Sequence, residues 1–156
     1  MEVALLLVDF SIKLIAGGLE VPKLEKLLKQ NPNLPAEIVR SVAHDELPNY
    51  YQSFDLFVFP TRLEESLGLV GIVPMASGVP VIASRIGGVQ DYLINGKNGF
   101  FFVPGSAEDL ADKIALYLNL PKQEEIQFSD NVRMTADRYR AEIVADTLFD
   151  HLFNSY

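Results

Sequence analysis

The sequence lacks cysteine and tryptophan and is short of basic side chains. Its 156 residues include 13 lysines and arginines against 21 aspartates and glutamates, which gives a formal net charge of -8. Without cysteine the chain forms neither a disulfide nor a thiolate metal site, and this excludes disulfide scaffolds and zinc fingers. The acidic excess repels phosphate backbones, so we expect no nucleic-acid partner.

Histidine is scarce as well. His44 and His151 are the two histidines, and neither has an acidic or second histidine partner at the spacing that metal ligands or a catalytic triad require. We therefore expect no metal and no other cofactor.

Long hydrophobic runs are also missing. Val3–Val8 is a strongly apolar start, but it is too short for the core of a signal peptide and has no basic residue before it. No later run approaches the roughly 20 residues of a membrane-spanning helix. These absences predict a cytoplasmic protein.

The composition itself is typical of one compact domain. Apolar residues make up 49% of the chain and charged residues 22%, the proportion found in soluble globular domains. A chain of this length buries enough surface to form a stable core without disulfide or metal cross-links. Because there is no repeat, low-complexity segment or internal linker, residues 1–156 are predicted to form a single domain.

Short apolar runs alternate with helical patterns along the chain. This order predicts an α/β domain of three layers with a mostly parallel, Rossmann-like sheet. Nearly continuous apolar runs of this length are typical of strands buried on both faces. The five predicted strands are Ile12–Ala16, Ile38–Val42, Leu56–Phe59, Val79–Ala83 and Phe100–Val103.

Three helices have recognisable starts. Pro22 fits the first turn of one helix, and Asp45 caps another. Ser106, followed three residues later by Asp109, resembles a capping box for a helix over Ser106–Leu118. The apolar residues predicted to face the sheet are Leu24, Leu27 and Leu28 in the first helix and Leu47, Tyr50, Tyr51 and Phe54 in the second.

The chain after Pro121 is predicted to be helical to its end. Apolar residues recur there at helical spacing, namely Ile143, Val144, Leu148, Leu152 and Phe153. Two interpretations stay open: a last helix packed on its own sheet, or an arm that reaches to a partner domain.

The most informative segment is FPTRLEESLGLVGIVPMASGVPVIA, from Phe59 to Ala83. It runs strand, loop, helix, turn and strand, and Gly68 lets the backbone turn tightly into the helix. The first-turn N–H groups near Leu69 and Val70 have no intrahelical partner, and together with the helix dipole they attract phosphate. In open α/β sheets, ligands bind outside the carboxyl ends of the strands, where this loop falls. The segment therefore predicts an anion site.

This segment resembles the donor-binding segment of the retaining GT-B glycosyltransferases, particularly glycosyltransferase family 4 (glycosyl transferases group 1). Members of that family carry aromatic-Pro-Ser/Thr, then Glu, a small residue and Gly-Leu, and later Met-Ala-Ser/Cys-Gly-x-Pro-Val-Ile. The similarity continues through SRIGGVQD (Ser84–Asp91), INGKNG (Ile94–Gly99) and VPG (Val103–Gly105). It covers most of residues 12 to 120.

The resemblance implies the C-terminal half of a two-domain enzyme, which holds a nucleotide diphosphate sugar while an N-terminal half holds the acceptor. Glu65 matches the first of two family glutamates and is the candidate catalytic residue, in contact with hydroxyls of the donor sugar. The second glutamate, which contacts the ribose, falls on Val73, whose side chain accepts no hydrogen bond. The implied donor-binding residues are Arg62, Ser66, Leu67, Gly68, Leu69, Val70, Val73, Gly87 and Gly88.

The chain also departs from the family pattern at its front. The family's first strand, and a loop whose arginine and lysine neutralise the leaving diphosphate, have no match before Ile12. Arg62 and Arg85 are either local substitutes or solubilising surface charges. Either Val3–Val8 belongs to the helix after the lost strand, or it folds back to fill the gap in the sheet. Pairing by another chain at that gap would give self-association.

Several residues have ordinary structural explanations. Glu64 is expected to be a surface residue, and Gly87–Gly88 is either a donor contact or a turn with positive φ. Tyr50, Tyr51 and the run Phe100–Phe102 are expected in the core rather than stacked on a base.

The resemblance as a whole implies transfer of a sugar from a nucleotide diphosphate sugar to a carbohydrate or lipid-linked acceptor, with retention, as in polysaccharide biosynthesis. The parent enzyme would be a cytoplasmic hexosyltransferase, peripheral to the membrane, and the isolated chain is expected to be inactive. The alternative is a non-catalytic, degenerate GT-B module for protein association or weak nucleotide binding. Val73→Glu distinguishes the two, because only a donor site gains nucleotide affinity.

Overall fold

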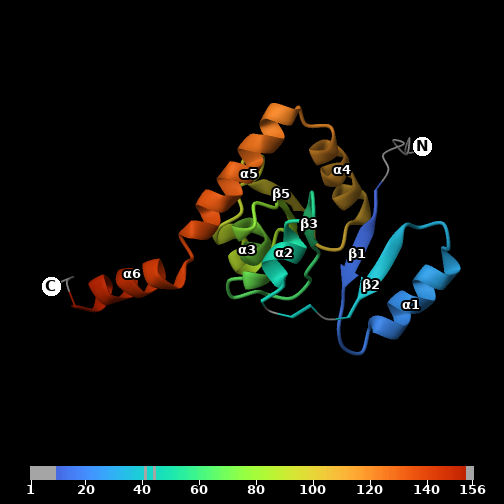
Figure 1. Ribbon diagram of the computed structural model, residues 1–156, viewed down its shortest axis with the longest axis horizontal. Helices are drawn as coiled ribbons and strands as arrows, with labels where there is room; N and C mark the ends of the chain where they lie inside the picture. The colour runs from blue at the N-terminus through green and yellow to red at the C-terminus, as the bar shows by residue number, and fades with distance from the viewer. Residues whose placement is uncertain (1–9, 41, 44, 154–156) are drawn as a thin grey trace. The chain divides into compact units, whose positions relative to one another are not determined.

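The computed structural model describes residues 10–40, 42–43 and 45–153 (Figure 1). The chain divides into two compact units, Met1–Glu46 and Leu47–Tyr156. The single domain predicted for residues 1–156 stays a prediction. His44 and the segment Val3–Val8 lie outside the described residues, so neither alternative for that segment is decided. No helix in the described part of the chain is long and apolar enough to cross a bilayer.

The first unit is a strand, a helix and a strand. β1 (Ile12–Ile15) pairs in parallel with β2 (Ala36–Val39), with Ile12 opposite Ala36. α1 (Val21–Gln30) connects them and has Pro22 in its first turn, as predicted. The predicted bounds of the strand Ile38–Val42 are wrong, because β2 begins two residues earlier and ends three residues earlier. β2 begins at Ala36 because the Ile12 N–H already pairs with the carbonyl of Pro35, one residue earlier.

The second unit contains a parallel three-stranded sheet in the order β3-β4-β5. Its elements in chain order are α2 (Leu47–Tyr51), β3 (Phe57–Phe59), α3 (Leu69–Ala76), β4 (Val81–Ser84), the 3₁₀ helix η1 (Gly87–Asp91), β5 (Gly99–Phe102), α4 (Ala107–Leu118), α5 (Lys122–Asp137) and α6 (Ala141–Phe153). All strands are parallel, as predicted, and each is within two residues of its predicted bounds.

Successive side chains of β4 point to opposite faces of the sheet, and all four are buried. The sheet of the second unit is therefore buried on both faces. Val81 and Ala83 belong to one apolar cluster, with Ile72 and Met75 of α3 and Val132 and Ala136 of α5. Ile82 belongs to a second cluster, with Phe100 and Phe102 of β5 and Tyr117 of α4. Helices therefore cover both faces, and the three-layer α/β class predicted from the sequence is confirmed.

Two helical predictions need correction. α2 ends at Tyr51, before Phe54, because the Ser53 and Phe54 N–H groups donate to carbonyls three residues back and close the last turn. The C-terminal helix is interrupted at Arg138–Arg140, and every side chain of α6 is exposed. The prediction that the last helix packs on its own sheet is therefore wrong for the described residues. The arm to a partner domain stays a prediction.

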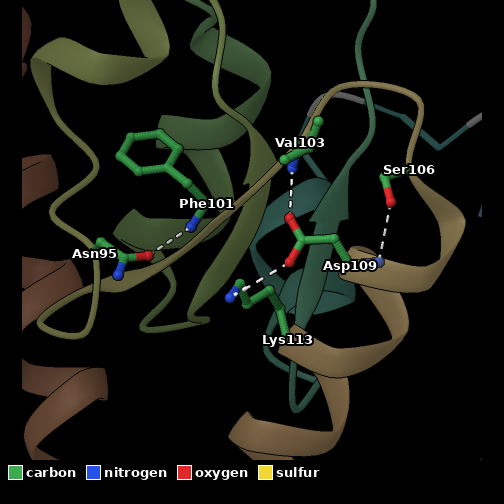
Figure 2. A network of polar contacts seen from close by, with 6 residues as sticks. All are labelled: Asn95, Phe101, Val103, Ser106, Asp109 and Lys113. Carbon is green, nitrogen blue, oxygen red and sulfur yellow. Dashed lines mark hydrogen bonds and ion pairs between the residues drawn. The ribbon is translucent and has the colours of Figure 1, made fainter.

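Side chains fix the turn between β5 and α4 (Figure 2). The Asp109 N–H donates to Ser106 Oγ over 3.1 Å, which is the predicted cap. The Asp109 carboxylate accepts from the Val103 N–H at 2.7 Å and lies 3.4 Å from Lys113 Nζ. Asn95 Oδ1 accepts from the Phe101 N–H in the same way. The end of β5 is therefore held by carboxylate and amide groups from two flanking segments.

Ser106→Ala is expected to lower the free energy of unfolding by about 1 kcal/mol, because the first turn of α4 loses the acceptor for one of its N–H groups. Urea unfolding measures the difference. Ser106→Asp keeps an acceptor and should stay within about 0.5 kcal/mol of the original chain. Equal stability of the alanine and aspartate variants would show that the cap does not hold α4.

Candidate functional site

The loop between β3 and α3 places Glu65 at the carboxyl end of the sheet. Thr61 starts the loop with a tight turn in which its hydroxyl accepts from the Leu63 N–H at 3.2 Å. The same hydroxyl lies 3.1 Å from Glu65 Oε1, to which it donates. Thr61 thereby orients a half-buried carboxylate that forms no ion pair among the described residues.

The Gly87–Gly88 turn packs directly on this loop. The Gly88 N–H donates to the Glu65 carbonyl at 2.8 Å. A Cβ on Gly88 would overlap the Ser66 carbonyl oxygen and lie 2.9 Å from Leu67 Cα. Gly87 has a φ of +50° and equally little room, since a Cβ there would lie 2.8 Å from the Glu65 nitrogen. Both glycines are required for a close approach of two backbones.

Gly68 joins this loop to α3. It caps the helix in the left-handed region, with φ +71° and ψ 53°, and its carbonyl accepts from the Gly71 N–H. The N–H groups of Leu69 and Val70 precede that first hydrogen bond, and neither has a protein acceptor among the described residues. They form the positive end of the helix dipole, next to the Glu65 loop.

Tyr92 holds the start of α3 through a buried hydrogen bond. Its side chain is fully buried, and its hydroxyl donates to the Gly68 carbonyl at 3.0 Å. Gly71 must lack a side chain because a Cβ there would overlap the Tyr92 hydroxyl. Burial, and then the negative charge of Glu65, raises the pKa of Tyr92 above its ordinary value, so the hydroxyl remains a donor.

Tyr92→Phe is expected to lower the free energy of unfolding by about 1 kcal/mol, since the Gly68 carbonyl keeps only its bond from Gly71. The amide resonances of Gly68–Val70 should shift with it. The control is Tyr139→Phe. The Tyr139 ring packs edge-to-face on Tyr92 with ring centroids 6.2 Å apart, but the Tyr139 hydroxyl forms no hydrogen bond within the described ranges. A loss of stability as large in the control would show that removal of either hydroxyl has this effect, and that the hydrogen bond to Gly68 is not its cause.

The two arginines near the site differ in their surroundings. Arg85 Nε donates to Gln90 Oε1 at 3.3 Å, and its guanidinium lies 5.8 Å from the centre of the Phe101 ring. Arg62 is exposed and lies close to Gly105. Neither forms an ion pair in residues 10–40, 42–43 and 45–153. Both positive charges remain available at this edge of the sheet.

The structure brings most of the predicted site residues together. Glu65, Ser66 and Leu67 contact the Gly87–Gly88 turn. Gly68 lies beside Val89, just beyond that turn. Leu69, Val70 and Val73 continue along the exposed side of α3. Their roles toward a donor stay predictions.

Sequence reasoning missed Thr61 and Tyr92 as positioning residues. Thr61 stands in the aromatic-Pro-Ser/Thr part of the motif, so its place next to the loop glutamate was a usable signal. Tyr92 had no such signal, because its partner Gly68 lies 24 positions away. Within the described residues no three His, Asp or Glu side chains gather as metal ligands would, and His151 is exposed on α6.

Comparison with known proteins identifies the family. Residues 11–134 match the family of glycosyl transferases group 1. The chain is a member of that family. The match includes the β3–α3 loop, the glycine turn and α3.

Sulfoquinovosyl transferase SQD2 of Arabidopsis thaliana is 40% identical to this chain over 108 residues. That alignment covers 67% of this chain but 21% of the transferase. CapM of Staphylococcus aureus, a capsular polysaccharide biosynthesis glycosyltransferase, is 29% identical over 130 residues, 83% of this chain and 32% of CapM. The chain thus spans a third or less of these relatives.

The fold recurs in solved structures of other proteins. Sucrose-phosphate synthase of Thermosynechococcus elongatus superposes with a TM-score of 0.75 at 29% identity, over 92% of this chain and 39% of the synthase. HepE of Anabaena, solved with UDP-glucose, gives a TM-score of 0.74 at 23% identity, over 94% of this chain and 41% of HepE. The chain therefore has the fold of one part of a GT-B glycosyltransferase.

Proposed function

We propose that this chain is the donor-binding, C-terminal half of a retaining family 4 glycosyltransferase. It would hold a nucleotide diphosphate sugar while an N-terminal half, supplied by a longer chain, holds a carbohydrate or lipid-linked acceptor. Membership of the family supports glycosyl transfer, and the retaining mechanism, the acceptor class and the C-terminal position are further parts of the proposal.

One observation carries the proposal: the unpaired N–H groups at the start of α3 lie beside an oriented carboxylate. A diphosphate placed at Leu69 and Val70 accepts from these groups and lies at the positive end of the helix dipole. The sugar bonded to that diphosphate then lies within reach of the Glu65 loop, where the carboxylate accepts from its hydroxyls. Thr61 and Gly88 hold Glu65 in place for this contact.

The charge requirements of the reaction fit the cations at this edge. Departure of the nucleotide leaves negative charge on the diphosphate, and preorganised donors beside it stabilise the transition state. Helix N–H groups supply part of this stabilisation, and Arg62, which has no ion-pair partner in the described part of the chain, is placed on the adjacent loop. The chain alone is expected to bind donor without turnover, because an acceptor half must close the site and exclude water.

The test is a titration of the chain with UDP, GDP and ADP and with their glucose and mannose conjugates, followed by backbone amide NMR. A donor domain responds to one nucleotide at Gly68–Val70 and Gly87–Gly88, and the base that binds names the donor class. Absence of any response at millimolar ligand would contradict the proposal.

The second candidate is the degenerate module for protein association. Val73 favours it, because this side chain offers no hydrogen bond to a nucleotide, and so does α6, whose apolar side chains are all exposed. Val73→Glu separates the two functions. A donor site gains nucleotide affinity from the new carboxylate, whereas an association module does not respond.

A further inference from the structure

The exposed side of α3 has no polar side chain. All eight residues of the helix, LVGIVPMA, are apolar. Leu69 is 61% exposed, Val70 52% and Val73 36%, whereas Ile72 and Met75 are buried in the core. The surface that continues from the unpaired N–H groups along the helix is therefore entirely aliphatic.

The other side of the same N–H groups is polar. There the Glu65 carboxylate accepts from the Thr61 hydroxyl at 3.1 Å, and Ser66 is exposed beside it. A diphosphate bound at Leu69 and Val70 thus separates a hydrogen-bonding surface from an aliphatic one.

The chemistry of a nucleotide sugar determines which end lies on which side. A hexose presents several hydroxyls and needs hydrogen-bond partners when it leaves water. A nucleoside has an apolar base face and two ribose hydroxyls, and aliphatic side chains pack well against the base. The hexose therefore belongs on the Glu65 side and the nucleoside along α3.

We propose, on the basis of the proposed function, that this site binds the nucleoside of its donor without any side-chain hydrogen bond from α3 to the ribose hydroxyls, and so accepts 2′-deoxyribonucleotides as well as ribonucleotides. Because Val73 is more than a third exposed, the hydroxyls that face it keep their contact with water. Ribose and 2′-deoxyribose are then bound equally well on this side of the site. Specificity for the nucleotide rests on the base and the diphosphate.

The experiment compares UDP, GDP and ADP with their 2′-deoxy counterparts in parallel titrations of the chain, read from the amides of Gly68–Val70. The dissociation constants of each ribo and deoxy pair should agree within about twofold. Val73→Glu should create a preference for the ribonucleotide of roughly tenfold, the usual effect of a hydrogen bond to a charged acceptor. Ala76→Glu adds the same charge to an exposed position at the far end of α3 and should leave the pair equal.

The outcomes separate this inference from the function on which it rests. If the unaltered chain binds a ribonucleotide more than about fivefold tighter than its deoxy counterpart, the inference is overturned, although the amide response still supports a donor site. If Val73→Glu binds both sugars equally, the ribose does not lie along α3 and the inference is likewise overturned. If no nucleotide moves these amides, the proposed function fails and the inference with it.

Discussion

Gly88→Ala is expected to destabilise the chain by roughly 2–3 kcal/mol and to abolish the response of the α3 amides to nucleotide. The added methyl overlaps the Ser66 carbonyl oxygen and lies 2.7 Å from its carbon, and both atoms belong to a backbone that has no rotamer to change. The two segments must separate, which breaks the bond from the Gly88 N–H to the Glu65 carbonyl. Thermal and urea unfolding measure the first effect, and amide NMR of the folded fraction measures the second.

Gly17→Ala is the matched control for this prediction. A Cβ on Gly17 would have nothing within 4 Å, and its φ is not in the left-handed region. The control should change stability by no more than about 0.5–1 kcal/mol and leave the nucleotide response intact. An alanine at Gly88 that is tolerated as well as the one at Gly17 would show that the glycine turn and the Glu65 loop are not in contact.

The features predicted correctly from the sequence are those that depend on neighbouring residues. Ser106 and Asp109 are three positions apart, so the cap of α4 could be recognised and its hydrogen bond is present. The strands of the second unit are continuous apolar runs, and this is the sequence pattern typical of a strand buried on both faces. Gly68 was predicted as the tight turn into α3, and its φ of +71° lies in the left-handed region that favours glycine.

The features that were missed depend on residues far apart in the chain. The hydrogen bond from Tyr92 to Gly68 joins two different segments, and no periodicity reveals it. The close approach of Gly88 to Ser66 is similar, since the sequence leaves open whether a pair of glycines serves a turn or a contact between backbones. For α6, helical spacing predicted an apolar side but not what covers it, and its side chains are exposed.

Glu65→Gln is expected to weaken binding of the nucleotide sugar by roughly tenfold or more while leaving the free nucleotide within about twofold. Glutamine has nearly the same shape and retains an oxygen that accepts from Thr61, so the loop should keep its conformation. What is lost is the negative charge, which makes hydrogen bonds from sugar hydroxyls stronger than those to a neutral amide. Calorimetric titration with UDP-glucose, GDP-mannose or ADP-glucose, each against its free nucleotide, measures the difference.

Glu64→Gln provides the control, because it removes one negative charge from the adjacent, exposed position of the same loop. A general change in the electrostatic field would affect both variants alike and would act on nucleotide and nucleotide sugar together. A direct contact between Glu65 and the sugar instead produces a loss that is confined to one variant and to the sugar-bearing ligand. Loss of a negative charge alone should strengthen the binding of an anionic ligand. If both variants strengthen the binding of nucleotide and nucleotide sugar alike, Glu65 acts only through its charge, and the hexose does not lie on this side of the α3 N-terminus.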